Sequence, residues 1–464
     1  MLNRALERLR NGLSGTPYES KIYLVGGYVR DKLLGRPLPS DVDLVLEGDA
    51  LELARFLHER GVADHPPVTY PRFGTAMVHV GGLMVELVTA RAESYHDASR
   101  KPATVKPATL YEDALRRDFT VNTLLENLHT GEIVDLLGTG LRDLQAKLLR
   151  TPRDPHETFY EDPLRMLRAV RFAVQLGFTI DPAAAQAIRE QADRLKIVSV
   201  ERIQTEFTRL MDSPQAAAGL QMLLEMGLLA QFAEPLLPMV GCTQNDYHLY
   251  DVWEHSLKTV ECVDPSGLTM PAWEVRLAAL LHDVGKPATK TVSEDGAIHF
   301  YEHDRVGAQI AHEWLRSLRY SNETIGRITT LVRMHMRPGL YTPQWRDAAV
   351  RRLIRDAGDL LEPLLRLTEA DIKAHRHDVV HADIAALRER IAQVQAAQPP
   401  TRWRSPLTGE QLMHHFGLEP GPLVGQLKRY LEEQVIEGAL HPDDTEHALR
   451  LARAYLRQVQ EPSV

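Results

Sequence analysis

The stretch YLVGGYVRDKLLGRPLPSDVDLVL, residues 23–46, constrains the fold of this 464-residue chain more than any other segment. An apolar run ends at the pair Gly26 and Gly27, a short helical pattern follows, and a second apolar run begins with Asp41 and Asp43. Successive side chains of a strand point to opposite faces, so two aspartates separated by one residue share a face. The segment therefore predicts a strand, a helix and a second strand that presents two carboxylates together.

Two carboxylates on one strand face suit divalent cations, and an oxygen-only ligand set favours Mg²⁺. Two such ions can clamp an in-line phosphoryl displacement. Gly26 and Gly27 would let a phosphate approach their backbone N–H groups. The helix that follows, with Arg30 in its first turn, favours anions at its N-terminus. A third carboxylate comes from Glu86 in LMVELVTAR, for which a surface position on an edge strand is the alternative.

Composition excludes several classes of protein. Hydrophobic residues make up 44% of the chain, enough for a substantial core, and a formal charge of -9 excludes a uniformly basic nucleic-acid binder, although a local basic face stays open. Cys242 and Cys262 form no CxxC pair, which fits a reducing compartment. The start of the sequence lacks a signal-peptide pattern, and no run of about 18 apolar residues occurs. We therefore expect a cytoplasmic protein without a membrane span.

Sequence character changes three times along the chain, which predicts four parts. Residues 1–150 mix strand-like and helical runs, so we expect an α+β head with a mixed or antiparallel sheet. Residues 151–240 have a helical pattern and would form a neck and body. Residues 241–380 stay helical and become rich in histidine, and residues 381–464 form a helical tail whose role the sequence leaves open.

The segment EDPLRMLRAVRF, residues 161–172, suggests how a nucleobase could be selected. Asp162 and Arg165 are three residues apart on an expected helix and would face the same way. A carboxylate only accepts hydrogen bonds and a guanidinium only donates them. Such a pair suits cytosine and adenine and leaves buried groups unpaired against uracil or guanine. The alternative is an ordinary i,i+3 surface salt bridge. Arg168 and Arg171 continue this face, either toward phosphate or RNA or into solvent.

Five motifs in order resemble those of class II tRNA nucleotidyltransferases, in the DNA polymerase β superfamily. They are GGYVRDKLLGRPLPSDVDLV (26–45), LRRDFTVNTLL (115–125), DLLGTGLRDL (135–144), EDPLRMLRAVRF (161–172) and SVERIQTEF (199–207). In the second motif, the resemblance implies that Arg117, Asp118 and Asn122 contact the sugar and phosphates of the nucleotide. The alternative for this motif is a helix start, capped by Asp118 or Thr120.

The segment TARAESYHDASRKPATVKP, residues 89–107, bears on which nucleotides are added. In CCA-adding relatives a flexible loop at this place helps to switch specificity from C to A. This chain retains such a segment, with Arg91, Glu93, Tyr95 and Arg100. The resemblance therefore implies addition of CCA to tRNA from CTP and ATP. The alternatives are an enzyme that adds only CC or only A, a poly(A) polymerase, and an RNA-binding protein with an inactive head. A homodimer stays open.

A second site is indicated by AALLHDVGKP, residues 278–287, where His282 and Asp283 adjoin. With His255 upstream and Asp371 downstream, the order resembles the HD superfamily of metal-dependent phosphohydrolases. Imidazole and carboxylate together hold Ni²⁺, Co²⁺, Mn²⁺ or Mg²⁺. The resemblance implies hydrolysis of 2′,3′-cyclic or 2′-phosphate ends. It also favours a tRNA enzyme over a poly(A) polymerase. The alternative to a metal site is that these histidines are buried in the core without a ligand role. The resemblance also points to three accessory residues: Lys286 as a phosphate contact, and His303 and His335 as further ligands.

Overall fold

The computed structural model describes residues 2–39, 41–96, 99–244, 250–375, 381–399 and 402–460, with backbone only for residues 93–96, 99–105 and 460. The chain divides into two compact units, residues 1–237 with 317–319 and residues 238–316 with 320–464. Within the described ranges, no helix is both long and apolar enough to cross a bilayer.

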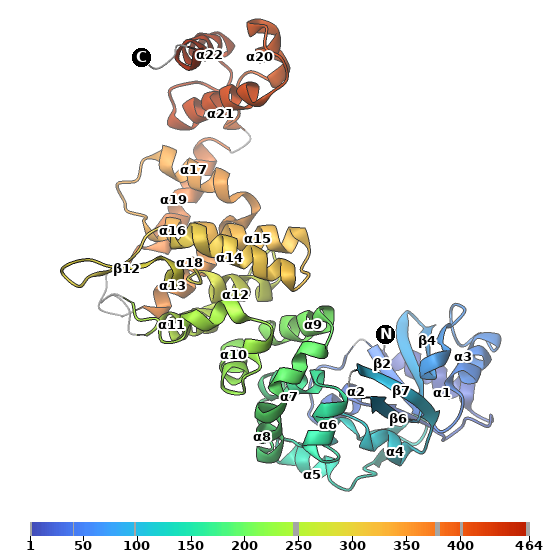
Figure 1. The fold of residues 1–464 in the computed structure, drawn as a ribbon. Coiled ribbons are helices and arrows are strands. Elements are labelled where there is room, and N and C mark those ends of the chain that lie inside the picture. Colours follow the sequence, from blue (N-terminus) through green and yellow to red (C-terminus); the bar gives the residue numbers. More distant parts are fainter. Residues whose placement is uncertain are drawn as a thin grey trace. The chain divides into compact units, whose positions relative to one another are not determined.

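A seven-stranded mixed sheet forms the centre of the head (Figure 1). Its strand order is β3-β4-β5-β2-β1-β8-β9, in which β2 and β5 run parallel and all other neighbours run antiparallel. The strands are β1 (Ile22–Val25), β2 (Asp41–Leu46), β3 (Val68–Tyr70), β4 (Thr75–Val80), β5 (Leu83–Thr89), β8 (Leu125–Asn127) and β9 (Ile133–Val134). The predicted α+β class with a mixed sheet is confirmed.

Short helices accompany this sheet. They are α1 (Leu2–Leu13), α2 (Gly27–Leu33), α3 (Ala50–Glu59), α4 (Leu110–Leu115) and α5 (Gly140–Gln145). Alternation along β2 buries Val42 and Leu44, whereas Asp41 is exposed and Asp43 is half-buried. Val42 and Leu44 thus point into the core and the two carboxylates point to the opposite face, as the sequence predicts, while Val45 on the carboxylate face is buried in a second apolar cluster.

The segment expected to be a flexible loop between β5 and α4 forms an antiparallel ladder of its own. Its strands are β6 (Arg91–His96) and β7 (Ser99–Pro107). The side chains of Glu93, Tyr95 and Arg100 lie outside the described part of the chain.

Five helices follow the head in the first unit: α6 (Pro155–Glu161), α7 (Leu164–Leu176), α8 (Pro182–Gln191), α9 (Val200–Met211) and α10 (Ala216–Glu225). Local sequence sets their ends. Asp154 and Asp181 cap α6 and α8, each followed by a proline at the first helical position. Gly177, with φ 69°, ends α7. A short parallel ladder, β10 (Leu148–Leu149) with β11 (Thr179–Ile180), is an addition to the helical pattern that was predicted.

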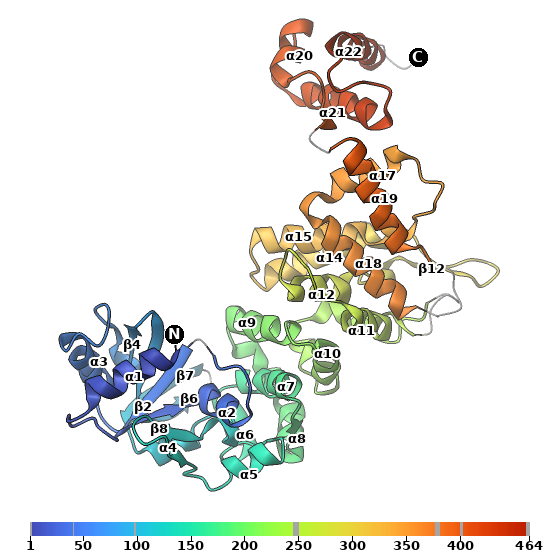
Figure 2. The same cartoon turned by 180° about the vertical axis from the view of Figure 1, so that it is seen from behind.

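The second unit is mainly helical. Its elements are α11 (Val252–Cys262), α12 (Ala272–Leu281), α13 (Lys286–Thr289), β12 (Lys290–Val292), β13 (Ile298–Phe300), α14 (His303–Ser317), α15 (Asn322–Met334), α16 (Met336–Gly339), α17 (Asp347–Ala357), α18 (Leu361–Ala374) and α19 (Ile384–Ala397). Helices α11, α12 and α18 pack together, as Figures 1 and 2 both show. The antiparallel hairpin of β12 and β13 departs from the all-helical expectation.

Three helices end the chain: α20 (Gly409–Phe416), α21 (Pro422–Glu437) and α22 (Thr445–Gln460). They share an apolar cluster that includes Leu412, Leu427, Leu431, Ala448 and Ala452. The predicted helical tail is therefore a small packed group of helices.

Candidate active sites

Three carboxylates meet on one face of the head sheet. In the parallel pairing of β2 with β5, Asp43 lies directly opposite Glu86, and Asp41 precedes Asp43 by two residues. Strand β5 has neighbours on both sides, so the edge-strand alternative for Glu86 is wrong. The three residues predicted to be catalytic are thus adjacent in the sheet.

The electrostatics of these carboxylates favour a bound cation. Burial raises the pKa of Asp43, with Asp41 adding to the effect and Arg117 opposing it. Burial and then Asp43 raise the pKa of Glu86. The cationic side chains nearby therefore do not balance the negative charge of these carboxylates. Oxygen ligands of this kind fit Mg²⁺. Among the described residues these three do not form a cluster with ligand atoms within 4.8 Å of one another, so water and phosphate oxygens would complete the shell of an ion.

Gly26 lies close to Asp43 of β2 and to Arg117 of the segment 115–125. It has φ +76°, and a Cβ built on it would lie 3.6 Å from Asp43 Oδ2 and 3.9 Å from Arg117 Nη1. A Cβ on Gly27 would lie 3.5 Å from Arg30 Nη2. The backbone of the glycine pair therefore lies against one carboxylate and two guanidinium groups, and the positive φ itself favours glycine at residue 26.

A buried polar chain extends from Arg30 to α7. Arg30 Nη1 donates to Asn122 Oδ1 at 2.8 Å, and Asn122 Nδ2 donates to Asp118 Oδ1 at 3.0 Å. Asp118 Oδ2 accepts from Arg168 Nε and Nη2 at 2.8 and 2.6 Å. Burial alone would raise the pKa of Asp118, but the charge of Arg168 and the bond from Asn122 lower it well below its usual value. Asp118 is therefore a permanently charged anchor.

The alternative for this motif was a helix start capped by Asp118 or Thr120; a short helix does start here, but neither residue caps it. Residues Thr120–Asn122 form a 3₁₀ turn whose N-cap residue is Phe119, without a side-chain cap bond. Asp118 Oδ1 instead accepts from the backbone N–H of Phe119 at 2.8 Å.

Arg171 is buried, so its predicted solvent alternative is wrong. Its Nε donates to Glu206 Oε2 at 2.6 Å, and Glu206 also lies 3.5 Å from Arg168. Burial lowers the pKa of Arg171 to about 10, with Glu206 opposing. The guanidinium carbons of Arg30, Arg168 and Arg171 lie 4.9, 5.1 and 4.0 Å from the ring centre of Phe172. These arginines form a packed structure around one aromatic ring.

Asp162 and Arg165 do not lie on one helix as predicted, because α7 begins two residues after Asp162. Asp162 accepts from Arg202 Nη1 and Nη2 at 3.2 and 2.9 Å. Arg165 is buried and donates through Nη2 to the carbonyl of Arg116 at 2.5 Å. Each side chain is thus held by another part of the fold, and neither contact is the i,i+3 salt bridge that was the alternative.

Three residues of this unit escaped sequence analysis: Asp113, Arg202 and Glu206. Asp113 accepts from both Arg116 and Arg117, at distances between 2.6 and 3.1 Å. Its i,i+3 and i,i+4 spacing in YEDALRR was a usable signal. Both Arg202 and Glu206 belong to α9. Arg202 contacts Asp162 at the end of α6, and Glu206 contacts Arg171 of α7. A single sequence carries no local signal for such pairings.

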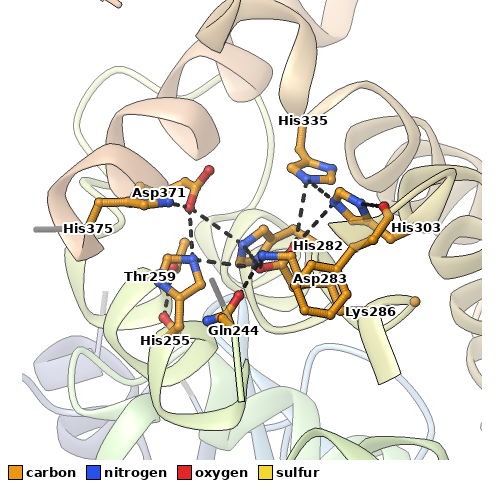
Figure 3. A network of polar contacts seen from close by, with 12 residues as sticks. Gln244, His255, Thr259, His282, Asp283, Lys286, His303, His335, Asp371 and His375 are labelled. Atoms are coloured by element: carbon orange, nitrogen blue, oxygen red, sulfur yellow. Dashed lines mark hydrogen bonds and ion pairs between the residues drawn. The ribbon is translucent and has the colours of Figure 1, made fainter. Parts of the chain in front are cut away.

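In the second unit, the histidines and aspartates predicted to bind metal lie close together (Figure 3). Asp283, His303, His335 and Asp371 line one cavity beside them. The structure groups the ligand atoms of these histidines and aspartates into two sets, each with all atoms within 4.8 Å. The sets are His255, His282 and Asp371, and Asp283, His303 and His335. Asp283 Oδ2 lies 3.1 Å from His282 Nε2 and its Oδ1 lies 3.4 Å from His303 Nε2, so this carboxylate faces both sets.

Backbone carbonyls orient three of these rings. The carbonyl three residues upstream accepts from Nδ1 of His282, His303 and His335 at 2.7, 2.8 and 2.7 Å. Each Nε2 then faces the carboxylate of Asp283, at 3.1, 3.4 and 3.8 Å respectively (Figure 3). Such outer contacts fix the tautomer and direction of metal-binding imidazoles.

The charges of the pocket also fit a cation. Burial disfavours protonation of His282, yet Asp283 and Asp371 outweigh it and raise its pKa to about 10. Burial, with His282 adding to it, lowers the pKa of His335 to about 4. Two buried carboxylates thus attract positive charge to the place that His282 Nε2 faces, and this buried atom makes no well-directed hydrogen bond to the described residues. A divalent ion bound by these nitrogen and oxygen atoms would satisfy both.

Lys286 lies beside these ligands. Its Nζ is 2.7 Å from Asp283 Oδ2 and donates to Gln244 Oε1 at 2.6 Å, so its contact with phosphate stays a prediction. Gln244 and His375 escaped assignment from the sequence, although His375 lines the pocket and its Nδ1 bonds the carbonyl of Asp371 at 2.8 Å. His377 lies outside the described residues.

Paired strand carboxylates beside a glycine turn define a metal-dependent nucleotidyltransferase head, here joined to an HD-type histidine and aspartate site. Models of three protein families match the chain in this order. They are the "Poly A polymerase head domain" at residues 22–150, the "Probable RNA and SrmB- binding site of polymerase A" at residues 177–239 and the "HD domain" at residues 252–387.

Whole-chain comparisons agree. The chain is 34% identical to the CC-adding tRNA nucleotidyltransferase of Thermus thermophilus over 92% of both chains, and 36% identical to the A-adding tRNA nucleotidyltransferase of Deinococcus radiodurans over 70% of this chain and 75% of that one. It is 30% identical to the CCA-adding enzyme of Levilactobacillus brevis over 90% of both. Its fold matches the Bacillus stearothermophilus CCA-adding enzyme with a TM-score of 0.71, 23% identity and 99% coverage of both chains. The chain belongs to the tRNA nucleotidyltransferase and poly(A) polymerase family.

Proposed function

We propose that the head and neck add C and A to the 3′ end of tRNA, from CTP and ATP and without a nucleic-acid template. The observation that carries this proposal is the convergence of Gly26, Asp43 and Arg117 at one point. Names of similar proteins support it: one related structure is described as complexed with CTP and another with a primer tRNA and an incoming ATP analog.

In this proposal, Asp41 and Asp43 would hold Mg²⁺, which would supply positive charge beside the phosphoryl group that is transferred. The 3′-hydroxyl oxygen of the tRNA bonds to the α-phosphorus, the bond from that phosphorus to the bridging oxygen of the β-phosphate breaks, and pyrophosphate leaves. Glu86, whose pKa is raised, accepts the hydroxyl proton. Arg30 and Arg117, beside the glycine backbone, neutralise the triphosphate.

Base selection is assigned to Asp162 and Arg165. The carboxylate would accept from the amino group of cytosine or adenine, and the guanidinium would donate to the adjacent ring nitrogen. Asp162 accepts from Arg202 and from the N–H of Leu164, and Arg165 donates to the carbonyls of Arg116 and Thr158. A carboxylate can accept about four hydrogen bonds and a guanidinium can donate five, so both side chains can make a further bond. Uracil and guanine would leave these groups unpaired, which a site of this kind rejects strongly.

Partial addition is the second candidate, because the Thermus relative that matches 92% of the chain is named as CC-adding and the Deinococcus relative as A-adding. Three tRNA substrates decide between the candidates: one that ends before CCA, one that ends after the first C and one that ends after CC, each incubated with single nucleotides. We expect C, then C, then A. An enzyme limited to CC or to A would act on only some of the three, a long A tail would indicate a poly(A) polymerase, and no addition at all would refute the proposal.

For the second unit we propose hydrolysis of 2′,3′-cyclic phosphate or 2′-phosphate ends. A divalent ion at His255, His282, Asp283 and Asp371 would supply the charge that stabilises the phosphoryl group and activates water. The oxygen of water bonds to phosphorus, the bond between phosphorus and a ribose oxygen breaks, and that oxygen leaves with a proton as a hydroxyl. The test is release of phosphate from 2′-nucleotides, and opening of cyclic ends, with Ni²⁺, Co²⁺, Mn²⁺ and Mg²⁺ in turn. Absence of both activities with every metal would refute it.

A further inference from the structure

An exposed aromatic pair lies at the pocket of the second unit. The side chain of Tyr301 is 70% exposed, the highest value among the exposed large apolar side chains of the described residues. Its ring is stacked on that of His299, with centroids 5.3 Å apart and planes 13° from parallel. The Tyr301 ring thus offers an aromatic surface to solvent, backed by a second ring.

The chain connection fixes this pair close to the metal ligands. His299 belongs to β13, Tyr301 follows it directly, and His303 begins α14. The carbonyl of Phe300 accepts from Nδ1 of His303 at 2.8 Å, so the end of the hairpin and the ligand are hydrogen-bonded to each other. An aromatic surface here cannot move far from the ligands without disturbing them.

The aromatic pair and the ligands share one cavity of about 350 Å³. Asp283, His303, His335 and Asp371 line it together with His299 and Tyr301. This volume is at the lower end of small-molecule sites and suits one nucleoside phosphate better than a folded RNA. Ile298 and Met336 add apolar lining. One part of the cavity therefore suits phosphate and a metal ion, and another suits a flat apolar group.

We propose that His299 and Tyr301 form a stacking platform for the nucleobase of the substrate, so that the second unit acts on nucleoside phosphates rather than on phosphate esters in general. Every nucleobase has a π-face, so stacking gives affinity without base specificity. The proposal rests on the proposed phosphohydrolase activity. A free nucleotide and the terminal nucleoside of an RNA chain offer the same chemistry to this platform.

The test compares adenosine 2′-phosphate with 2-glycerophosphate, which is also a phosphate ester of a secondary alcohol with neighbouring hydroxyl groups but has no base. Tyr301→Ala should lower kcat/KM for the nucleotide about tenfold, mainly through KM, as expected when a stacking aromatic is removed. The rate with 2-glycerophosphate should stay within about twofold. Tyr301→Phe should behave as the wild type, as should Val292→Ala, a change at another exposed residue of the same hairpin.

A second readout does not depend on hydrolysis. Fluorescence of 2-aminopurine riboside 2′-phosphate should be quenched by the wild type and much less by Tyr301→Ala. If the wild type hydrolyses neither ester with any metal, the phosphohydrolase function fails, and this quenching still decides whether the platform binds a base. Equal losses on both esters, or unchanged quenching in Tyr301→Ala, would overturn the proposal. A third substrate is an RNA oligonucleotide with a 2′-phosphate end, whose hydrolysis should show the same dependence on Tyr301. The ratio of its rate to the rate with the free nucleotide shows whether the platform prefers a free nucleotide or the end of an RNA chain.

Discussion

Replacing Asp162 with asparagine tests base selection with little change of shape. The substitution keeps one acceptor oxygen and turns the other into an amide donor. Cytidine then loses a hydrogen bond to a charged acceptor, worth roughly 1.5–3 kcal/mol, whereas uracil gains a donor for its carbonyl. The preference for CTP over UTP should therefore fall by about tenfold or more, because 1.4 kcal/mol corresponds to a factor of ten.

Stability should change far less than selectivity. The side chains of Asp162 and Arg202 are 18% and 34% exposed, so solvent screening limits their ion pair to about 1 kcal/mol. For a unit of this size that is a shift in Tm of about 2–4 °C. Asp154→Ala is a matched control, because Asp154 caps the same helix that Asp162 ends. Loss of that cap should cost about 1 kcal/mol and leave selectivity intact.

The assay measures single-turnover incorporation of each of the four nucleotides into a tRNA that ends before CCA. Arg202→Gln is a second variant for this assay, because it removes the ion-pair partner of Asp162 and keeps the carboxylate. It should lower the preference for CTP over UTP less than Asp162→Asn does. Wild-type discrimination against UTP in Asp162→Asn, with a Tm close to that of the control, would refute base selection by this residue and leave it as a structural contact of Arg202.

Three further predictions follow from the contacts. Asp43→Asn should lower the rate of nucleotide addition about a thousandfold or more, through loss of several kcal/mol of charge stabilisation. It should not lower Tm in the absence of metal, because burial raises the pKa of Asp43 and so disfavours its charged form. A large drop in Tm would contradict this. His282→Ala should abolish phosphate release from 2′-nucleotides and leave CTP addition nearly intact, and parallel loss of both activities would mean that the second unit supports the first structurally. Arg168→Ala leaves the buried charge of Asp118 with fewer donors and should destabilise the first unit by about 3 kcal/mol. Calorimetry against Arg209→Ala measures this, because the Arg209 side chain is 57% exposed and lies 3.8 Å from Glu206, which keeps its closer contact with Arg171. The pKa of Asp118 is lowered in the native state, so the advantage of the wild type should persist above about pH 4 and shrink below it.

Patterns of short range predicted much of this protein. Strand alternation placed Asp41 and Asp43 on one face, and the glycine pair predicted the turn that precedes α2. A family resemblance pointed to the histidines and aspartates of the second unit, and their ligand atoms do gather in two close sets. In each case the signal lies within a few residues or in a motif.

Contacts between distant segments could not be predicted in this way. The contact of Arg202 with Asp162 depends on how α9 packs beside the end of α6, and the contact of Arg168 with Asp118 depends on how α7 packs against the head. The error over Asp162 has a local cause: the proline that follows it disfavours helical geometry in the residue before it, so α6 ends there. The hairpin of β12 and β13 was missed because its strands are only three residues long.

Contacts between neck and head suggest how a base edge influences chemistry at a phosphate several groups away. Arg165 donates to the carbonyl of Arg116, and the next residue, Arg117, lies against Gly26 beside Asp43. A second route runs from Arg168 through Asp118 and Asn122 to Arg30. Both routes consist of buried or half-buried polar contacts, which allow few alternative arrangements. A base that displaces Arg165 would therefore disturb the groups that hold the triphosphate, so the wrong nucleotide would be penalised in the transition state as well as in binding.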